Sequence, residues 1–197
     1  MRRRRLDPEA RRLEIMEAAE RLLRAEGAAV RVEDVAVAAG VGKGTVFHYF
    51  PTWDDLLEAL RRRVFERFDA GYQLPTEVDG PVDWLQVLDA VAAAFIAFTL
   101  DQEKLHEVLF HSDFARRRPL PPKEHAAARL EAMIRAGQEA GEFAMLDPEP
   151  TARLMFALLH ESADAVAEGA DFDRSLAALQ IILRRCLQTR PEPERTR

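Results

Sequence analysis

The sequence has 197 residues, of which 48% are hydrophobic and 31% are charged, as is typical of a globular protein that folds in water. Its longest apolar stretch, residues 91–100, is about half of the roughly 18 residues that a membrane-spanning helix needs. The basic start of the chain leads into charged residues, so we expect no signal peptide. A single cysteine, Cys186, excludes a disulfide within the chain and indicates a reducing compartment, the cytoplasm.

The acidic residues are unevenly distributed along the chain. The net charge is −6, yet residues 1–69 contain 14 basic and 13 acidic residues, whereas residues 70–197 contain 14 and 21. The N-terminal part is therefore only weakly basic. Any nucleic-acid binding there depends on where single cations lie rather than on a broad positive field.

The first helix is expected to begin at Asp7-Pro8-Glu9, because Asp is a good N-cap and Pro is favoured at the first helical position. Apolar residues recur at helical spacing up to about Glu26, and Gly27 is expected to end the helix. The preceding Arg2–Arg5 form either a solvated tail or an arm that follows the DNA backbone or enters the minor groove.

Two short helices joined by a tight turn are expected between residues 33 and 50. The first ends at Gly40. The second runs from Gly44 to Phe50 and is stopped by Pro51. This is the pattern of a helix-turn-helix, whose second helix can enter the major groove of DNA.

The second of these helices has an apolar and a polar side. At about 100° per residue, Val46, Phe47 and Phe50 share a side that holds the domain together. The other side offers a cation, a hydroxyl, an imidazole and a phenol to phosphates and base edges. We expect DNA contact from Thr45, His48 and Tyr49, with Lys43 on a phosphate at the helix N-terminus and Arg31 as a weaker candidate.

Residues 12–57 resemble the DNA-binding domain of the tetracycline-repressor-like (TetR) regulators. The matching residues are Ile15, Ala18-Ala19, Leu22-Leu23, Gly27, Val35-Ala36, Ala39-Gly40-Val41, Lys43-Gly44-Thr45, Phe47, Tyr49-Phe50 and Asp55-Leu56. Three positions depart from the family's usual residues: Arg31 replaces a Thr, Gly42 a Ser, and Trp53 a Lys that contacts the DNA backbone. The resemblance implies a regulator that binds DNA and whose C-terminal domain commonly binds an apolar or amphipathic effector.

A long fourth helix is expected from Trp53 to about Ala70, opened by a capping-box pattern at Thr52. Its consecutive Arg61–Arg63 are interpreted as a solvated face. The Gly- and Pro-bearing residues 71–81 form the loop that divides the chain. We assign residues 1–52 to a helix-turn-helix DNA-binding domain, 53–190 to a helical effector-binding and dimerisation domain, and 191–197 to a disordered tail.

The rest of the chain shows helical patterns at residues 82–100, 102–114, 121–140, 148–168 and 172–188. The first of these is apolar on nearly every side, as a central buried helix is. Alternating β-branched runs with turn dipeptides, the signal for strands, are absent from the sequence. We expect an all-α fold of about nine helices: an N-terminal three-helix helix-turn-helix domain and a C-terminal helical ligand-binding and dimerisation domain.

Catalytic and metal-binding patterns are not apparent in the sequence. It shows no nucleophile with a base and no paired carboxylates in an arrangement that catalysis needs. His106 and His111 are five residues apart, which is about 140° around an α-helix, so they should not share a face. We expect no enzyme activity, no metal site and no cofactor.

Large side chains on the C-terminal helices form either an ordinary core or a ligand pocket. The family resemblance, rather than residue spacing, favours the pocket, in which a few polar groups would orient an apolar ligand. The expected effector-binding residues are Phe95, Phe98, Thr99, His106, Phe110, Met133, Met155, Phe156 and His160.

The last two helices are more apolar than a surface pair should be, which predicts a four-helix bundle between two subunits. Cys186 is interpreted as a core or interface residue. The sequence favours a homodimeric repressor that a small effector releases from a palindromic DNA operator. The other hypotheses are a regulator that is constitutive or controlled by a protein partner, and a helical dimer that has lost DNA binding.

Overall fold

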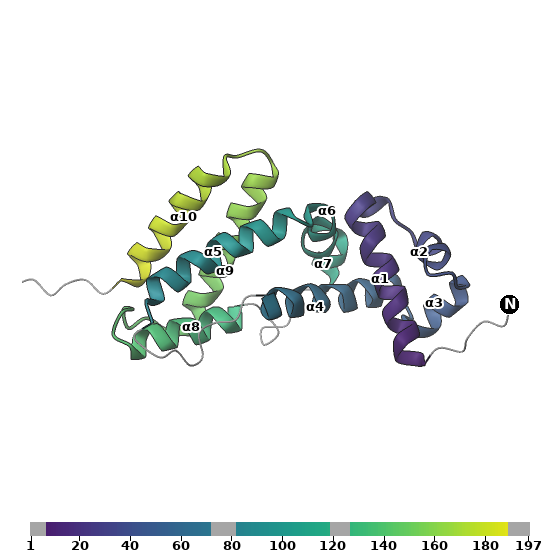
Figure 1. Ribbon diagram of the computed structural model, residues 1–197, viewed down its shortest axis with the longest axis horizontal. Coiled ribbons are helices and arrows are strands. Elements are labelled where there is room, and N and C mark those ends of the chain that lie inside the picture. The colour runs from purple at the N-terminus through teal and green to yellow at the C-terminus, as the bar shows by residue number, and fades with distance from the viewer. Residues whose placement is uncertain (1–6, 72–81, 119–126, 189–197) are drawn as a thin grey trace, which may run out of the picture. The chain divides into compact units, whose positions relative to one another are not determined.

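The computed structural model describes residues 7–71, 82–118 and 127–188 (Figure 1). The helices are α1 (Pro8–Glu26), the 3₁₀ turn η1 (Gly27–Ala29), α2 (Val32–Ala38), α3 (Lys43–Tyr49), α4 (Trp53–Gly71), α5 (Trp84–Leu100), α6 (Glu103–His106), the π-helix η2 (Glu107–His111), α7 (Asp113–Arg117), α8 (Ala127–Glu139), α9 (Pro148–Ala167) and α10 (Phe172–Leu187). The predicted all-α class is confirmed, since β pairing within these ranges is limited to an isolated bridge between Phe143 and Gln188.

Helices α1, α4 and α9 begin where the sequence predicted, and α4 does so through side-chain capping, whereas the Asp7 side chain expected to cap α1 makes no cap hydrogen bond. At the start of α4, the backbone N–H of Thr52 donates to Oδ2 of Asp55 (2.9 Å), and the backbone N–H of Asp55 donates to Oγ1 of Thr52 (3.1 Å). This reciprocal capping box satisfies two backbone donors that a helix N-terminus otherwise leaves unpaired. Pro8 and Pro148 open α1 and α9 at their first helical positions.

The helix predicted over 102–114 is instead three short segments, α6, η2 and α7. Ser112 separates the last two: its hydroxyl donates to the carbonyl of Val108 (2.6 Å) and accepts from the backbone N–H of Phe114 (3.2 Å). A serine side chain that bonds its own backbone competes with continuous helix. The arm Arg2–Arg5, the loop residues 72–81, the start of the helix expected at 121 and the tail 191–197 lie outside the described residues.

The chain divides into two compact units. The first comprises residues 1–67 and 102–119, and the second residues 68–101 and 120–197. Helix α4 therefore contributes residues to both units. The functional boundary expected after Thr52 stays a prediction.

The first unit contains the helix-turn-helix and the α6–α7 segment. Its core collects apolar side chains from several helices, as α1 packs against α2 and α6 and α2 packs against α3. The residues with no more than 1% of their surface exposed include Ile15, Ala18, Ala19, Leu23, Val35, Val46, Leu56, Leu60, Leu105 and Leu109.

One arginine of α4 also belongs to this core. Arg61 is only 2% exposed, donates to the carbonyl of Arg118 (2.7 Å) and pairs with Glu58. The interpretation of Arg61–Arg63 as a solvated face is therefore wrong for Arg61, because these polar partners allow a guanidinium to be buried. Arg62 is exposed and Arg63 is half-buried.

The second unit is built around α9, which packs against α5, α8 and α10 (Figure 1). As its composition predicted, α5 is buried along much of its length and packs on α9 and α10. The loop after α8 is tied to the end of α10, since the backbone N–H of Ala144 donates to the carbonyl of Leu187 (2.6 Å). No single described helix is both long and apolar enough to cross a membrane; α5 and the helical segment after it pass that test only when taken together across a break.

Candidate nucleic-acid interface and aromatic clusters

The turn between α2 and α3 has the tight geometry that the sequence predicted. Gly40 adopts φ +63°, a left-handed conformation that glycine reaches without steric cost, and the backbone N–H of Val41 donates to the carbonyl of Ala36 (2.9 Å). Gly42 is the N-cap of α3 and supplies no side-chain bond. The backbone N–H groups in the first turn of α3 therefore receive no hydrogen bond acceptor from the side chain of the N-cap residue.

Helix α3 divides into a buried and an accessible side. Val46 and Phe50, one turn apart, are 1% and 2% exposed. The polar side chains predicted to touch DNA lie on the accessible side: Lys43 and His48 are exposed, while Thr45 and Tyr49 are half-buried. The rings of His48 and Tyr49 meet edge to face, with centroids 5.2 Å apart.

Phe47 is not part of the domain core, so that prediction is wrong. It is 37% exposed, and Nζ of Lys43 lies 5.7 Å from its ring centroid. The physical reason is that Val46 and Phe50 fill the inner side of this two-turn helix, and Phe47 is rotated about 100° from Val46. Phe50 is buried as expected, with the guanidinium carbon of Arg12 4.8 Å from its ring centroid.

Lys43 also has an acidic partner that sequence reasoning missed. Its Nζ lies 2.5 Å from Oε1 of Glu33 on α2, and both side chains are about half exposed. This hydrogen bond lowers the pKa of the Glu33 carboxyl below its usual value. Because ten residues and the turn separate the two, no spacing rule for a single helix could reveal the pair.

The other two departures from the family pattern lie at helix starts. Arg31 is the exposed residue before α2, and its backbone N–H donates to Oδ2 of Asp34 (2.8 Å). Trp53 is the half-buried first residue of α4, beside the Thr52–Asp55 capping box. The cap hydrogen bonds at these two helix starts come from Asp34 and from the Thr52–Asp55 pair.

A buried carboxylate on α1 organises several arginines of the first unit. Glu20 is 7% exposed and pairs with Arg24 (3.3 Å), Arg63 (3.5 Å) and Arg67. Arg24 and Arg67 also donate to Oε1 of Gln102, at 2.8 and 3.2 Å. This network connects α1, α4 and the residue before α6, and the sequence signal for it was only an isolated acid within an apolar helix face.

The α7 end is held on the start of α4 by two ion pairs. Arg117 donates to both carboxylate oxygens of Asp54, at 2.9 and 3.1 Å, and a guanidinium nitrogen of Arg118 lies 2.8 Å from Oδ1 of Asp55. Hydrogen bonds from Thr52 and then Arg118 lower the pKa of Asp55. The bond to Asp54 raises the pKa of Arg117.

The residues predicted to bind an effector fall into both units. In the second unit, Phe95, Phe156 and His160 form a mutual cluster, with ring centroids 5.9 Å (Phe95–Phe156), 4.8 Å (Phe95–His160) and 4.3 Å (Phe156–His160) apart. The other predicted effector-binding residues in this unit are Phe98, which is half-buried, and Thr99, Met133 and Met155, which are buried. His106 and Phe110 belong to the first unit, where their rings are 4.6 Å apart.

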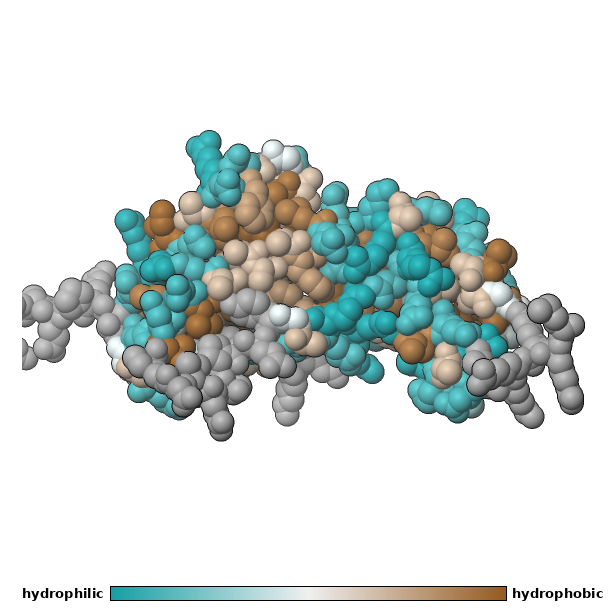
Figure 2. All heavy atoms as spheres, in the orientation of Figure 1, coloured by the Kyte–Doolittle hydropathy of each residue, from teal (hydrophilic) through white to brown (hydrophobic). Residues whose placement is uncertain are grey.

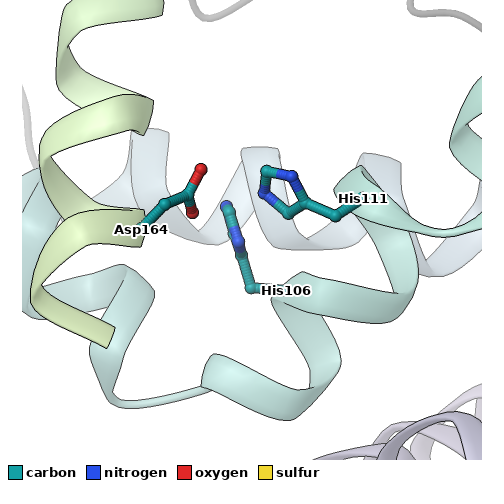
Figure 3. Close-up of side chains that lie close together, drawn as sticks. All are labelled: His106, His111 and Asp164. Atoms are coloured by element: carbon teal, nitrogen blue, oxygen red, sulfur yellow. The ribbon is translucent and has the colours of Figure 1, made fainter. Parts of the chain in front are cut away.

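His106 and His111 are brought together, so the expectation that they occupy different faces is wrong. Their ring centroids are 5.3 Å apart, and Figure 3 shows the two imidazoles side by side. The segment between them is a π-helix, in which the i→i+5 repeat places residues five apart about one turn from each other. Figure 3 also labels Asp164, which belongs to α9 in the second unit, whereas both histidines belong to the first unit.

Helices α9 and α10 leave large apolar side chains exposed. Figure 2 shows brown, apolar residues over these helices on the face in view. The exposed fractions are 68% for Leu154, 37% for Leu158, 52% for Ile181 and 46% for Ile182. Cys186 is also exposed, so it is not a core residue of this chain. An apolar surface of this kind is typical of an interaction site.

Comparison with known proteins connects the N-terminal helices to one family. Residues 15–60 match the family described as "Bacterial regulatory proteins, tetR family". A curated relative, the HTH-type transcriptional repressor LfrR of Mycolicibacterium smegmatis, is 46% identical over 50 residues. That match covers 25% of this chain and 26% of the relative, so the chain spans about a quarter of the relative's length in the match.

Solved structures extend the likeness to most of the chain. A TetR-family transcriptional regulator from Pectobacterium atrosepticum is 24% identical with a TM-score of 0.74, over 96% of this chain and 100% of that one. RolR, solved in complex with resorcinol, is 22% identical with a TM-score of 0.65, over 95% and 97%. At these identities the likeness shows the fold.

Proposed function

We propose that this chain, which belongs to the TetR family of bacterial regulatory proteins, represses transcription by binding a palindromic DNA operator through α3. The observation that carries the proposal is the accessible side of α3, which presents Lys43, Thr45, His48 and Tyr49 while Val46 and Phe50 anchor the helix. Hydroxyl, phenol and imidazole groups can donate to or accept from base edges, and an ammonium can bind a phosphate.

The half-buried positions of Thr45 and Tyr49 support them as the base-reading pair. A side chain that is partly packed loses less conformational entropy on binding than a fully mobile one. Lys43, at the first helical position, would exchange Glu33 for a phosphate, and Arg31 would contribute a further backbone contact. Specificity would then come from α3, and the salt dependence of affinity from the two cations.

A homodimer through α9 and α10 would present two copies of α3 to the two halves of a palindrome. The exposed Leu154, Leu158, Ile181 and Ile182 support this interface, since pairing α9 and α10 with the same helices of a second chain would remove them from water. Cys186, exposed on α10, would lie near or within the same interface.

A small apolar or amphipathic effector would control DNA binding. The cluster of Phe95, Phe156 and His160 supports this, because it combines aromatic surface with an imidazole that can orient a polar group. The structurally similar RolR was solved with resorcinol, a compound with an aromatic ring and two hydroxyls. Helix α4, which contributes residues to both units, would transmit the effect. A coupling of about 1–3 kcal/mol would weaken operator binding roughly 5- to 150-fold.

The direct test is footprinting of the purified protein on the DNA upstream of its own coding region at moderate salt. The wild type should protect a palindrome, and the double variant Thr45→Ala with Tyr49→Ala should not, while keeping its thermal stability. Arg135→Ala, which removes an exposed cation from α8, is the matched control and should protect as the wild type does.

Selection from random DNA would follow if no protection appeared upstream. Failure to select any sequence would overturn the DNA-binding proposal. If operator affinity ignored every ligand that binds the second unit, DNA binding would stand, and control by a protein partner or constitutive repression would replace the small effector.

A further inference from the structure

The π-helix η2 creates an arrangement of histidines that an α-helix over the same residues would not. In an α-helix His106 and His111 would point about 140° apart. In η2 the hydrogen bonds run from residue i to residue i+5, so His111 returns to the side of His106 (Figure 3). Such π-helical turns are frequent at functional sites.

The two imidazoles differ in how firmly they are held. His106 is 6% exposed and packs against the ring of Phe110, which in turn contacts Phe65 with centroids 5.4 Å apart. His111 is exposed to solvent. One ring is therefore packed against an aromatic wall, while the other is accessible from solvent.

We propose that His106 and His111 form a two-histidine site for a late first-row divalent metal ion such as Zn²⁺. Imidazole nitrogen is a preferred ligand for Zn²⁺, Cu²⁺ and Ni²⁺. The ligand nitrogens of the pair lie within 4.8 Å of each other. Two nitrogens bound to one tetrahedral Zn²⁺ at about 2.0–2.1 Å are about 3.3 Å apart, a separation that lies inside this limit. Water or an added donor ligand fills the remaining positions.

The site would lie in the same compact unit as the helix-turn-helix. Just before α6, Gln102 accepts hydrogen bonds from Arg24 of α1 and Arg67 of α4, and Lys104 donates to the carbonyl of Ala25 (2.8 Å). A metal that fixes the end of α6 and η2 is thus linked by short contacts to the helices that support α3. This goes beyond the proposed function, which requires no metal.

The test is calorimetric titration of the full-length protein, freed of metal with a chelator, with Zn²⁺ alone. The wild type should bind one Zn²⁺ per chain. His111→Ala and His106→Gln should each weaken binding at least about tenfold, since each removes one of two protein ligands. His48→Ala, which removes an exposed histidine of α3, should bind as tightly as the wild type. With Cu²⁺ as the probe, electron paramagnetic resonance should show coupling to two imidazole nitrogens that falls to one in His111→Ala.

Three outcomes overturn the site. The first is that the wild type does not bind Zn²⁺. The second is equal Zn²⁺ affinity in the wild type and His111→Ala, which would mean an adventitious ion only. The third is a Cu²⁺ spectrum that His111→Ala leaves unchanged. Because His111 is exposed, its variant tests the site even if His106→Gln fails to fold. The titration contains no DNA, so its failure leaves the operator proposal intact, and loss of operator binding leaves the metal result intact.

Discussion

The guanidinium carbon of Arg61 on α4 lies 4.9 Å from the ring centroid of Phe114 on α7. The same guanidinium donates to the carbonyl of Arg118 and pairs with Glu58, so a buried charge is matched by a ring face, a carbonyl and a carboxylate. This contact and the Arg117–Asp54 pair attach α7 to α4 within the first unit. Arg61 therefore has a buried structural role that its exposed neighbour Arg62 lacks.

Arg61→Ala should destabilise the protein by about 2–4 kcal/mol, because it opens a cavity and leaves the Arg118 carbonyl and Glu58 without this partner. Arg62→Ala removes the exposed neighbour and should change the free energy of unfolding by less than about 0.5 kcal/mol. Urea denaturation of both variants measures the difference. Equal effects of the two substitutions would contradict the buried role of Arg61.

The Thr52–Asp55 capping box should give the protein an acid-sensitive component of stability. Hydrogen bonds from Thr52, followed by Arg118, lower the pKa of Asp55 in the folded state. A depressed carboxyl pKa stabilises the fold above the unfolded value of about 3.9, and that contribution is lost as pH falls through the folded pKa.

Asp55→Asn should therefore flatten the fall in stability below about pH 4, as measured by thermal unfolding across that range. Thr52→Ala should cost about 0.5–2 kcal/mol at neutral pH through loss of the cap. Glu139→Gln, which removes an exposed carboxylate from α8, is the control for pH and should keep the wild-type slope. If Asp55→Asn kept the wild-type slope, the cap would not be the source of acid sensitivity.

The sequence predicted those features that depend on neighbours in the chain. The Asp7-Pro8 and Thr52–Asp55 signals predicted the starts of α1 and α4 because helix starts are decided within one turn: Pro8 occupies the first helical position of α1, and the Thr52–Asp55 pair caps α4. The accessible polar side of α3 followed from helical periodicity alone.

Other features depend on contacts between distant segments. Arg61 is buried because α7, more than fifty residues later, supplies Phe114 and the Arg118 carbonyl. Lys43 meets Glu33 only because the turn folds α3 back towards α2. The π-helical repeat at Glu107–His111 has no residue pattern of its own, so an α-helical period misplaced His111.

Gly137 of α8 lies directly beneath a buried aromatic ring. A Cβ atom added at this glycine would lie 2.2 Å from Cδ2 of Phe143, which is 1% exposed. Alanine is the better helix former by about 1 kcal/mol, yet Gly137→Ala should lower the free energy of unfolding by about 1–3 kcal/mol through overpacking. Gly44→Ala, with nothing within 4 Å of its Cβ, should instead be neutral or stabilising. Urea denaturation distinguishes the two, and a stabilising Gly137→Ala would mean that the Phe143 ring moves aside at little cost.

The Glu33–Lys43 pair makes a specific prediction about DNA affinity. The hydrogen bond from Lys43 lowers the pKa of the Glu33 carboxyl. Glu33 is a carboxylate at neutral pH in any case, so it competes with any phosphate for the ammonium. Glu33→Gln should tighten operator binding about 1.4- to 5-fold, which corresponds to the roughly 0.2–1 kcal/mol of an exposed ion pair. Lys43→Ala should weaken binding and reduce the slope of log affinity against log salt by about 0.9, the value for one phosphate contact.

Glu139→Gln is the charge-matched control, because it removes an exposed carboxylate from α8; it should leave affinity unchanged if the effect is local. Fluorescence anisotropy at several salt concentrations measures all three variants. Weaker binding by Glu33→Gln would mean that Glu33 orients Lys43 for DNA rather than competing with it. An unchanged salt slope in Lys43→Ala would remove Lys43 from the interface, and the phosphate contacts would then have to come from other cations such as Arg31.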